Sequence, residues 1–273
     1  MAAIRRVLAR YDVAAIQELS QMPSAPFVCG PNTESVICAA RPDAAEYAVA
    51  ASPRIGDEQY AVMARRSTAE VTERGATYPD PKGVHARAPH MFEVAVKAGS
   101  SDWKLEVGVT HTSPRRAAAE ISNFPNVLRW MAGASGGSAS THYILAGDFN
   151  ADGTYFPESK TWPASRLGLD FKGYTLLTGN DLDSTIAESS NSYDRIIVDD
   201  AMAARSGRAQ VFRLEEIDLS AVHVEGCKMG YVPSKRCSAA LAGAPWSRYP
   251  EALKTELAKE LSDHYPVEVC LRG

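Results

Sequence analysis

Polar side chains that can do acid–base or metal chemistry stand beside several apolar runs of this sequence. Apolar runs form buried strands, so a polar residue at the end of one lies at the rim of a sheet, where ligands bind. A single acid in such a position is most often a turn residue or a helix cap. A whole set in one chain indicates a shared site, and that set is Glu18, His111, Asp148, Asn150, Asp194, Asp263 and His264.

The chemistry open to this set follows from its ligand atoms. Carboxylate and amide oxygens without a thiolate suit Mg²⁺ or a similar hard cation. Two histidines, each with an acid, can serve as general base and general acid. A metal ion, a base and an acid are together the components needed to cleave a phosphodiester bond with water. The residue types therefore point to phosphoester hydrolysis.

Short strands and a few helices are the elements that must position these residues. The apolar run Val13–Ile16, for example, ends just before Glu18. Ser113 and Pro114 predict the start of a helix, with the serine as N-cap and the proline in the first helical position. The mixture predicts one α/β domain over residues 1–273. Strands are expected at 13–16, 60–63, 91–96, 105–109, 143–146, 196–198 and 267–271, and helices at 2–10, 113–131 and 250–261.

Composition limits the class of protein further. The 273 residues carry a formal net charge of −4 and are 45% hydrophobic, which suits a globular domain and argues against a strongly basic nucleic-acid-coating protein. A local basic cleft or a bound cation can still meet phosphates on an acidic chain. No apolar stretch approaches the ~18 residues that a transmembrane helix needs, so no membrane segment is expected.

Five cysteines leave the redox compartment open. Their spacing allows two short-loop disulfides, Cys29–Cys38 and Cys227–Cys237, or a fully reduced protein. Neither pair has the Cys-x-x-Cys spacing of a zinc knuckle.

Four segments carry a resemblance to a known family. They read RYDVAAIQE at 10–18, GDFNAD at 147–152 with Tyr155 after it, YDRI at 193–196 and SDHYPV at 262–267. In this order and spacing they resemble the deoxyribonuclease I family of the endonuclease/exonuclease/phosphatase superfamily. The resemblance implies a four-layer α/β/β/α sandwich, in which two packed mixed β-sheets are flanked by helices. It also implies a monomeric, metal-dependent endodeoxyribonuclease with DNA as its substrate.

The resemblance assigns the metal and phosphate sites position by position. Glu18 becomes the metal carboxylate, with Asp263 near it, for Mg²⁺ or Mn²⁺. Asp148 and Asn150 orient the scissile phosphate and the attacking water. Arg87 matches an arginine that contacts phosphate.

The same resemblance assigns two histidine–carboxylate pairs. His264 with Asp194 becomes the general base, and His111 with Glu58 the general acid. A carboxylate on one imidazole nitrogen fixes the tautomer and favours the imidazolium. The base must be neutral at rest and the acid charged, so the two pairs need different environments.

The sequence departs from the family pattern at its start. The family begins with a strand that bears an active-site asparagine, upstream of the first helix, whereas Met1 falls inside that helix. The expected fold therefore lacks the first strand, and its metal site is one ligand short. An incomplete sequence would explain this and would favour a secreted or extracellular protein. A loss of activity is the alternative explanation.

Two further departures concern the grip on DNA. Ser20 and Gly56 stand where the family's pancreatic member has an arginine and a tyrosine that contact the minor groove. Residues 213–250 form an insertion that the family does not need, with Cys227, Cys237 and several basic residues inside it. This insertion is either a solvated surface element or a substitute contact with DNA.

A structural Ca²⁺ site is a further expectation from the family. Asp183 and Thr185, with Ser189, lie where the family has a calcium loop. Three oxygen-bearing residues in one loop are more often an ordinary loop, so both interpretations stay open.

These observations leave three functions as hypotheses. The first is metal-dependent hydrolysis of DNA phosphodiester bonds, with water activated by His264 and its partner Asp194. The second is a phosphoesterase that acts on a phosphoinositide or another small phosphate ester, which the residues at Ser20 and Gly56 favour. The third is a catalytically inactive binding protein of the same fold, which the missing strand favours.

Overall fold

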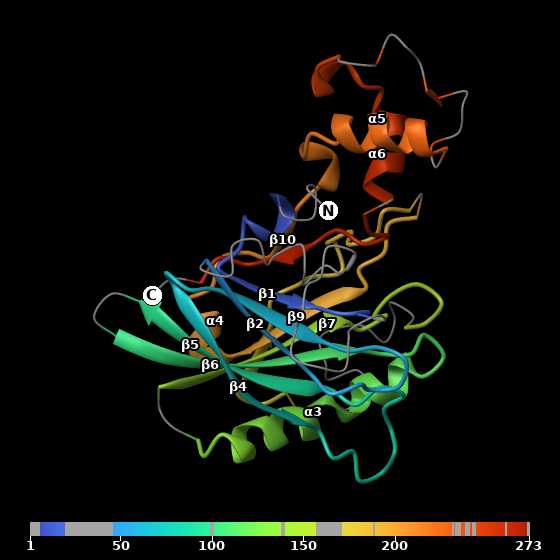
Figure 1. Cartoon of the computed structure of the whole chain (residues 1–273). Coiled ribbons are helices and arrows are strands. Elements are labelled where there is room, and N and C mark those ends of the chain that lie inside the picture. Colours follow the sequence, from blue (N-terminus) through green and yellow to red (C-terminus); the bar gives the residue numbers. More distant parts are fainter. Residues whose placement is uncertain are drawn as a thin grey trace.

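A computed structural model gives the conformation of most of the chain. It describes residues 6–19, 46–98, 101–137, 140–156, 171–187, 189–230, 232, 236–237, 241, 244–259 and 261–271. Two β-sheets pack face to face in these residues, and helices lie on either side of the pair (Figure 1). The predicted α/β sandwich is confirmed.

The larger sheet has six strands in the order β4-β5-β6-β7-β9-β8. Strands β6 and β7 are parallel, and every other neighbouring pair is antiparallel. The parallel pair is joined through a helix, as such a connection requires. The bounds of these strands are β4 Ala69–Thr77, β5 His90–Ala98, β6 Ser101–His111, β7 Thr141–Asp148, β8 Tyr174–Leu176 and β9 Asp194–Asp199.

The smaller sheet has three strands in the order β1-β3-β2, and all of its pairs are antiparallel. A separate antiparallel pair, β10 with β11, lies near it. The bounds of these strands are β1 Val13–Ile16, β2 Tyr47–Ala51, β3 Ala61–Arg65, β10 Gln210–Val211 and β11 Val267–Glu268.

Alternation along β6 shows how the sequence divides the two sides of the larger sheet. Leu105 and Val107 turn inward and join the core between the sheets, where they meet Val62 of β3. Gly108 turns the other way, towards Met131 of the helix that covers the outer face. A Cβ at this glycine would lie 2.9 Å from the Met131 sulfur, so the glycine allows the helix to pack closely.

Helix α3, Ala117–Ala134, covers that outer face (Figure 1). The prediction that Ser113 is its N-cap is wrong. The backbone N–H of Arg116 bonds instead to the Ser113 carbonyl, and a turn precedes the helix. Ser113 donates its own N–H to the buried Glu120 carboxylate at 3.3 Å, which holds the turn in place. Pro125 lies within the helix without ending it.

A third apolar cluster holds the C-terminal helices together, on the side of the molecule away from α3 (Figure 1). It includes Phe212, Leu253 and Leu257, all buried. Most of the predicted insertion at 213–250 lies here, and the structure joins Cys227 to Cys237 in a disulfide. The elements of this half are η4 Leu214–Glu216, α5 Ser220–Met229, η6 Trp246–Arg248 and α6 Glu251–Lys259. Helix α4, Asp200–Ala203, packs instead against the main core next to β9. None of the helices described is both long and apolar enough to cross a membrane.

Candidate active site

The polar residues predicted from the sequence gather at one rim of the sandwich. His111 is the last residue of β6, Asp148 the last of β7 and Asp194 the first of β9. The strand register pairs His111 with Asp148 and Asp148 with Asp194, so these residues stand side by side on neighbouring strands. Glu18 follows β1 and His264 precedes β11, and both lie at the same rim.

Gly147 allows this close register. Its φ angle is 145°, and a Cβ at this position would lie 1.9 Å from the Thr110 carbonyl oxygen. Any other residue would push β7 away from β6, and with it Asp148 away from His111. The glycine of the GDFN segment therefore sets the spacing of the site.

His264 and Asp194 form the first histidine–carboxylate pair. His264 Nδ1 lies 2.8 Å from Asp194 Oδ2. Burial opposes the charged imidazole, but the hydrogen bond and charge of Asp194 outweigh it and raise the pKa of His264 to about 9. The bond to Nδ1 also fixes which ring nitrogen faces outward, because it leaves Nε2 free of Asp194.

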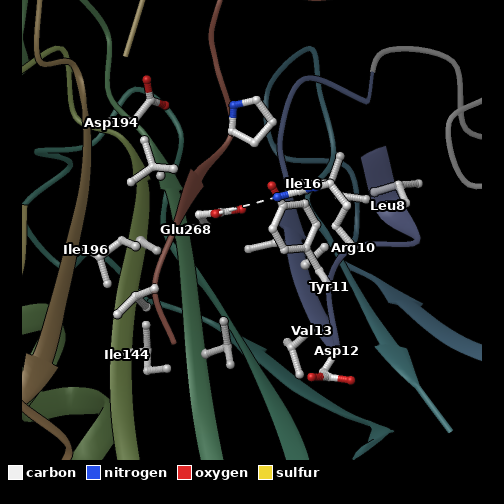
Figure 2. A pocket seen from close by; sticks show the side chains of 18 of the residues that line it. Leu8, Arg10, Tyr11, Asp12, Val13, Ile16, Ile144, Asp194, Ile196 and Glu268 are labelled. Carbon is white, nitrogen blue, oxygen red and sulfur yellow. Dashed lines mark ion pairs between the residues drawn. The ribbon is translucent and has the colours of Figure 1, made fainter. Parts of the chain in front are cut away.

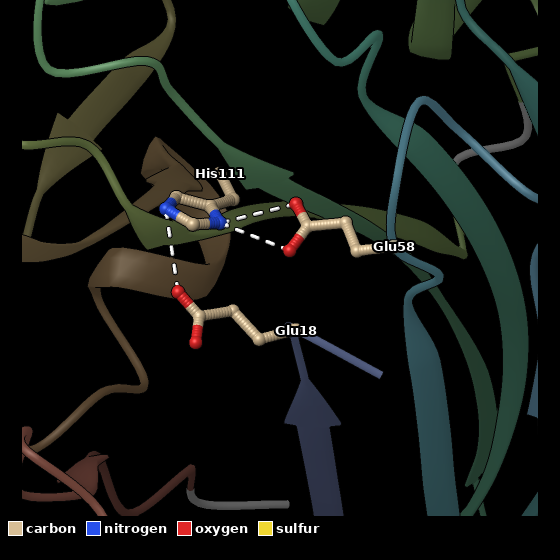
Figure 3. A group of neighbouring side chains, drawn as sticks. All are labelled: Glu18, Glu58 and His111. Atoms are coloured by element: carbon tan, nitrogen blue, oxygen red, sulfur yellow. Dashed lines mark hydrogen bonds and ion pairs between the residues drawn. The ribbon is translucent and has the colours of Figure 1, made fainter. Parts of the chain in front are cut away.

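His111 and Glu58 form the second pair. His111 Nδ1 lies 3.0 and 3.2 Å from the two Glu58 oxygens (Figure 3). On the other side of the ring, Nε2 lies 3.6 Å from both Glu18 Oε1 and Asp148 Oδ2. Burial again opposes the charge, but Glu58 and then Asp148 raise the pKa of His111 above its usual value.

Asp148 lies between the two pairs and interacts electrostatically with both histidines and with Asp194. Burial, followed by the charge of Asp194, raises the pKa of Asp148 to about 6. Its Oδ1 accepts a 2.7 Å hydrogen bond from the backbone N–H of Asn150. A carboxylate in this position is sensitive to any further charge that enters the site.

Asn150 is almost fully buried and adopts a positive φ of 46°, which only a tightly held turn maintains in a non-glycine residue. Its Nδ2 donates to the Thr112 carbonyl oxygen at 3.0 Å, which ties the loop after β7 to the loop after β6. One amide hydrogen is thereby used within the protein.

Glu18, Glu58 and His111 are the described residues that come close enough to share a metal ion. Each can offer one ligand atom, and these atoms lie within 4.8 Å of one another (Figure 3). Glu18 has a positive φ of 59° and a side chain that is 68% exposed, so its carboxylate stands at the mouth of the site. With Asp148 nearby, the donor set is rich in carboxylate oxygens and fits a hard divalent cation. Asp263, the other predicted ligand, lies in the same rim but outside this group.

Arg87 has a different setting from the phosphate contact that the resemblance implies. Its Nε lies 2.7 Å from Glu58 Oε1 and also donates to the His111 carbonyl oxygen at 3.2 Å. An Nη2 hydrogen bonds to the Thr112 carbonyl oxygen at 3.2 Å. Much of the guanidinium is therefore occupied by the protein, and Glu58 is held between Arg87 and His111.

The predicted calcium loop is organised by its own hydrogen bonds. Asp183 Oδ1 accepts from the Thr185 N–H and hydroxyl, both at 3.3 Å, and from the Asn191 N–H at 3.2 Å. Protein donors thus occupy Oδ1 of Asp183. Cys29, Cys38 and Ser20 lie outside the described residues.

Two positioning residues were not singled out from the sequence. The side-chain oxygen of Gln17 accepts the backbone N–H of Asp148 at 3.0 Å, and the Tyr60 hydroxyl accepts that of His111 at 3.2 Å. Gln17 directly follows β1 and continues the alternation of Val13 and Ala15, which is the signal available in the sequence. The signal at Tyr60 was weaker, because an aromatic residue before a strand is usually core.

Arg195 is a third such residue, and it is fully buried. Its guanidinium donates to the carbonyl oxygens of Thr178, Gly179 and Ala151, at 3.2, 2.8 and 3.1 Å, and to the side-chain oxygen of Asn180 at 3.0 Å. Burial lowers its pKa to about 10. The arginine therefore fastens the loop after β7 to the segment before β9.

An α/β sandwich with paired histidines and carboxylates at one rim defines a hydrolase. The chain belongs to the endonuclease/exonuclease/phosphatase family, which residues 1–264 match. Deoxyribonuclease-1-like 2 from Mus musculus is 28% identical over 216 residues, which cover 74% of this chain and 70% of that protein.

Solved structures share the fold at lower identity. TDP2 from D. rerio, complexed with single-strand DNA product, has a TM-score of 0.52 and 15% identity, and the match covers 80% of this chain and 86% of that one. The mannosyl-6-phosphatase of Bacteroides thetaiotaomicron has a TM-score of 0.52 and 12% identity, with 77% and 79% of the two chains covered. At these identities the two structures support the fold alone.

Proposed function

We propose that this protein is a divalent-metal-dependent endonuclease that hydrolyses DNA phosphodiester bonds. The observation that carries the proposal is the arrangement of two histidine–carboxylate pairs around Asp148 at one rim. His264–Asp194 lies on one side of this carboxylate and His111–Glu58 on the other. Such a pair of groups can remove a proton from water and return one to the leaving oxygen.

His264 is the proposed general base. Asp194 holds Nδ1, so Nε2 is the nitrogen that accepts the proton from the attacking water once the imidazole is neutral. A pKa of about 9 keeps His264 charged at neutral pH in the metal-free protein, and a cation held at the rim would lower that pKa. Asp194 then stabilises the imidazolium that forms. Asp148 orients the water and the phosphate, with Asn150 holding the Asp148 carboxylate through its backbone N–H.

His111 is the proposed general acid. Glu58 on Nδ1 favours the charged imidazole, and Nε2 is the nitrogen that gives its proton to the leaving oxygen. Arg87, which contacts Glu58, keeps that carboxylate in place. In this proposal Arg87 acts mainly through Glu58.

Glu18, with Glu58 or Asp263 beside it, would hold Mg²⁺ or Mn²⁺. When bound, such a cation would offset negative charge on the phosphate in the transition state. The carboxylates gathered at the rim support this, because the charge of Asp194 adds to burial in raising the pKa of Asp148. The Asp183–Thr185 loop keeps Ca²⁺ as a separate, weaker proposal.

DNA is the proposed substrate because the curated relative is a deoxyribonuclease. The second candidate is a phosphoesterase on a smaller phosphate ester. Ser20 and Gly56 favour it, since neither can grip a duplex as an arginine and a tyrosine do. The mannosyl-6-phosphatase among the fold relatives shows that the fold also serves small phosphates.

A plasmid-nicking assay with Mg²⁺ tests the first candidate. We expect His264→Gln to lower the nicking rate by about 10³-fold. His142→Gln is the matched control, because His142 also pairs with an aspartate, Asp199 at 3.2 Å, but at the opposite end of β7. Equal activity of the wild type and the His264 variant would exclude the proposed base.

A panel of phosphoinositides and sugar phosphates, assayed beside DNA, separates the two enzymatic functions. Turnover of a small ester without nicking would favour the phosphoesterase. The inactive binding protein is distinguished by calorimetric titration with Mg²⁺. DNA binding without any metal binding or turnover would support that third function.

A further inference from the structure

Glu120 is a buried carboxylate that the proposed mechanism does not use. Its side chain is 0% exposed in the first turn of α3, where the helix dipole favours a negative charge. The hydrogen bonds that the carboxylate accepts from the described residues, however, come from outside the helix. A buried carboxylate needs compensating partners, so the groups that contact Glu120 indicate what this residue does in the fold.

One carboxylate oxygen of Glu120 joins two loops of the site. Oε1 accepts the backbone N–H of Ala86 and that of Ser113, each at 3.3 Å. Ala86 directly precedes Arg87 in one loop, and Ser113 follows His111 in the other. Glu120 thus fastens together the two loops beside the proposed general acid.

The same two loops are also bonded to each other closer to the rim. Arg87 donates through Nε to the His111 carbonyl and through Nη2 to the Thr112 carbonyl, both at 3.2 Å. The Thr112 carbonyl also accepts from Asn150 Nδ2 at 3.0 Å, and the Thr112 N–H donates to the Asp148 carbonyl at 2.9 Å. A shift of these loops would therefore reach His111, Asn150 and Asp148 together.

His85 faces the second carboxylate oxygen of Glu120. His85 Nδ1 lies 3.7 Å from Glu120 Oε2, and both side chains are 0% exposed. Neither atom has a hydrogen-bond partner among the described residues. The imidazole is held in place by Phe124, which stacks on it with 6.0 Å between ring centroids and 10° between planes, and by Tyr78, which meets it edge-on at 5.7 Å.

A series of side-chain hydrogen bonds along α3 determines which nitrogen of His85 carries the hydrogen. Arg129 Nη1 donates to Asn126 Oδ1, and Asn126 Nδ2 donates to Asn123 Oδ1, each at 2.7 Å. Asn123 Nδ2 then lies 3.0 Å from His85 Nε2. Guanidinium and amide nitrogens can only donate, so the direction of the whole series is fixed and Nε2 accepts. The ring hydrogen is therefore on Nδ1, where it attracts Oε2 of Glu120 and leaves Oε1 turned towards the loops.

We propose that Glu120, oriented by His85, is a positioning residue for the proposed general acid. It holds the two loops so that Arg87, His111 and Asn150 keep the geometry that the reaction needs, although it touches none of the reacting atoms. The catalytic consequence rests on the proposed function, whereas the fastening of the two loops does not.

Glu120→Gln tests the proposal with almost no change in volume. The amide has one donor and one acceptor, so its NH₂ group must meet either the His85 Nδ1 hydrogen or the two backbone N–H groups. We expect hydrogen exchange at the Ala86 and Ser113 amides to become about tenfold faster. Exchange at Val84 is the internal control and should not change, because this amide in the same loop bonds to a different carboxylate, that of Asp80, at 3.0 Å.

Plasmid nicking by the same variant measures the catalytic consequence. We expect kcat to fall about 30-fold and KM to change by less than about twofold, because displaced loops misalign the general acid without removing a contact with DNA. Glu106→Gln is the matched control and should leave kcat unchanged. Glu106 is also buried, with one oxygen that has no hydrogen-bond partner among the described residues, but it lies in the middle of β6.

A second substitution distinguishes positioning from packing. Asn123→Asp offers an acceptor to His85 Nε2, so the ring hydrogen can move there and Nδ1 can accept from the amide introduced at position 120. We expect the double variant Glu120→Gln/Asn123→Asp to recover most of the lost kcat and the slow exchange at Ala86 and Ser113. Altered packing alone would not be reversed, because the second change adds no volume beside position 120.

Asn126→Ala is the test to use if the Glu120 variants do not fold. Asn126 is exposed and belongs to the hydrogen-bond series, so its loss should make exchange at Ala86 and Ser113 about threefold faster. Ser122→Ala, at an exposed position of the same helix outside the series, is the matched control and should have no effect.

Three outcomes overturn the proposal. One is unchanged exchange at Ala86 and Ser113 in folded Glu120→Gln, or in Asn126→Ala where the first variant does not fold. Another is a double variant no better than Glu120→Gln, and the last is faster exchange with an unchanged kcat. If the wild type does not nick DNA, the proposed function fails, and the exchange rates still decide whether Glu120 fastens the loops.

Discussion

The two histidine–carboxylate pairs have the same chemistry but different surroundings. The side chains of His111 and Glu58 are 11% and 6% exposed, and those of His264 and Asp194 are 24% and 17% exposed. Glu58 is held by Arg87 as well as by its histidine, and the backbone of His111 is fixed by Tyr60. His264 instead lies in the loop before β11, where it lines the pocket between β1 and β11 (Figure 2).

We infer from this difference that the two pairs contribute differently to the stability of the fold and to the chemistry. Breaking the enclosed pair leaves a charged guanidinium without its partner, so it should damage both stability and activity. Breaking the more open pair should damage activity, and it should lower stability only at pH values where His264 is charged. The following predictions, from the largest expected effect to the smallest, test that division.

Asp194→Asn should lower the proposed nuclease activity by about 10³-fold, because the neutral amide no longer stabilises the imidazolium of His264. Above about pH 9 the midpoint of thermal unfolding should stay close to that of the wild type, because His264 is then neutral in the wild type and its pairing adds little stability. Plasmid nicking and thermal denaturation, measured on the same samples, give both values. A large loss of stability would show that this pair is structural as well.

Asp194→Asn should also lower the pKa of His264 in the metal-free protein. The wild-type pKa of about 9 should fall, because burial still opposes the charge and Asp194 no longer offsets it, while Asp148 and Asp263 remain. A folded pKa above the unfolded one stabilises the wild type fully below about pH 6.5, and this contribution is lost as the pH rises through 9. NMR titration of the imidazole checks the shift, and an unchanged pKa would contradict the assigned partner.

Glu58→Gln should lower activity by about 10²-fold, since the charged form of His111 loses its support. It should also lower the free energy of unfolding by about 3 kcal/mol, because Arg87 is left without its carboxylate. Urea denaturation measures the second effect. The control is Asp57→Asn, because the carboxylate of Asp57 is next in sequence to Glu58, is 86% exposed and lies 3.9 Å from Arg87. Equal stability of the two variants would remove the distinction between the pairs.

Glu18→Gln should raise the Mg²⁺ concentration needed for half-maximal activity by about tenfold, because one carboxylate at the mouth of the site is neutralised. Stability should not fall, since the side chain is 68% exposed. Asp12→Asn, at an exposed carboxylate on the other end of β1, is the control. Unchanged Mg²⁺ dependence would place the cation elsewhere, with Asp263 as the next position to test.

Much of the rim could be predicted from the sequence because the rule is local. An apolar run such as Tyr143–Ala146 must be buried, and the polar residues after it must then lie where the strand ends. Parallel β6 and β7 bring their ends to one edge, so His111 and Asp148 meet. The resemblance added Glu58, which no local rule connects to His111.

Some contacts could not be predicted from the sequence, because they depend on which loops meet in space or on which group bonds to a residue near the start of a helix. The resemblance implies that Arg87 contacts phosphate, and the structure places Glu58 as its nearest carboxylate. Nothing in the sequence spacing of residues 58 and 87 indicates that the two loops meet. Serine is a typical N-cap residue. The backbone N–H of Ser113, however, donates to the carboxylate of Glu120, which lies seven residues further along the chain. The size of the pocket between β1 and β11 could not be predicted from the sequence, because it depends on how the two strands are arranged in space.

The buried clamp of Arg195 bears on how far this sequence can diverge. Most of its hydrogen bonds go to main-chain carbonyls, which every amino acid carries. The loops that it grips are thus free to change side chains, as far as the clamp is concerned, while the arginine is not. Contacts made to the backbone in this way can persist while most side chains of the two loops change.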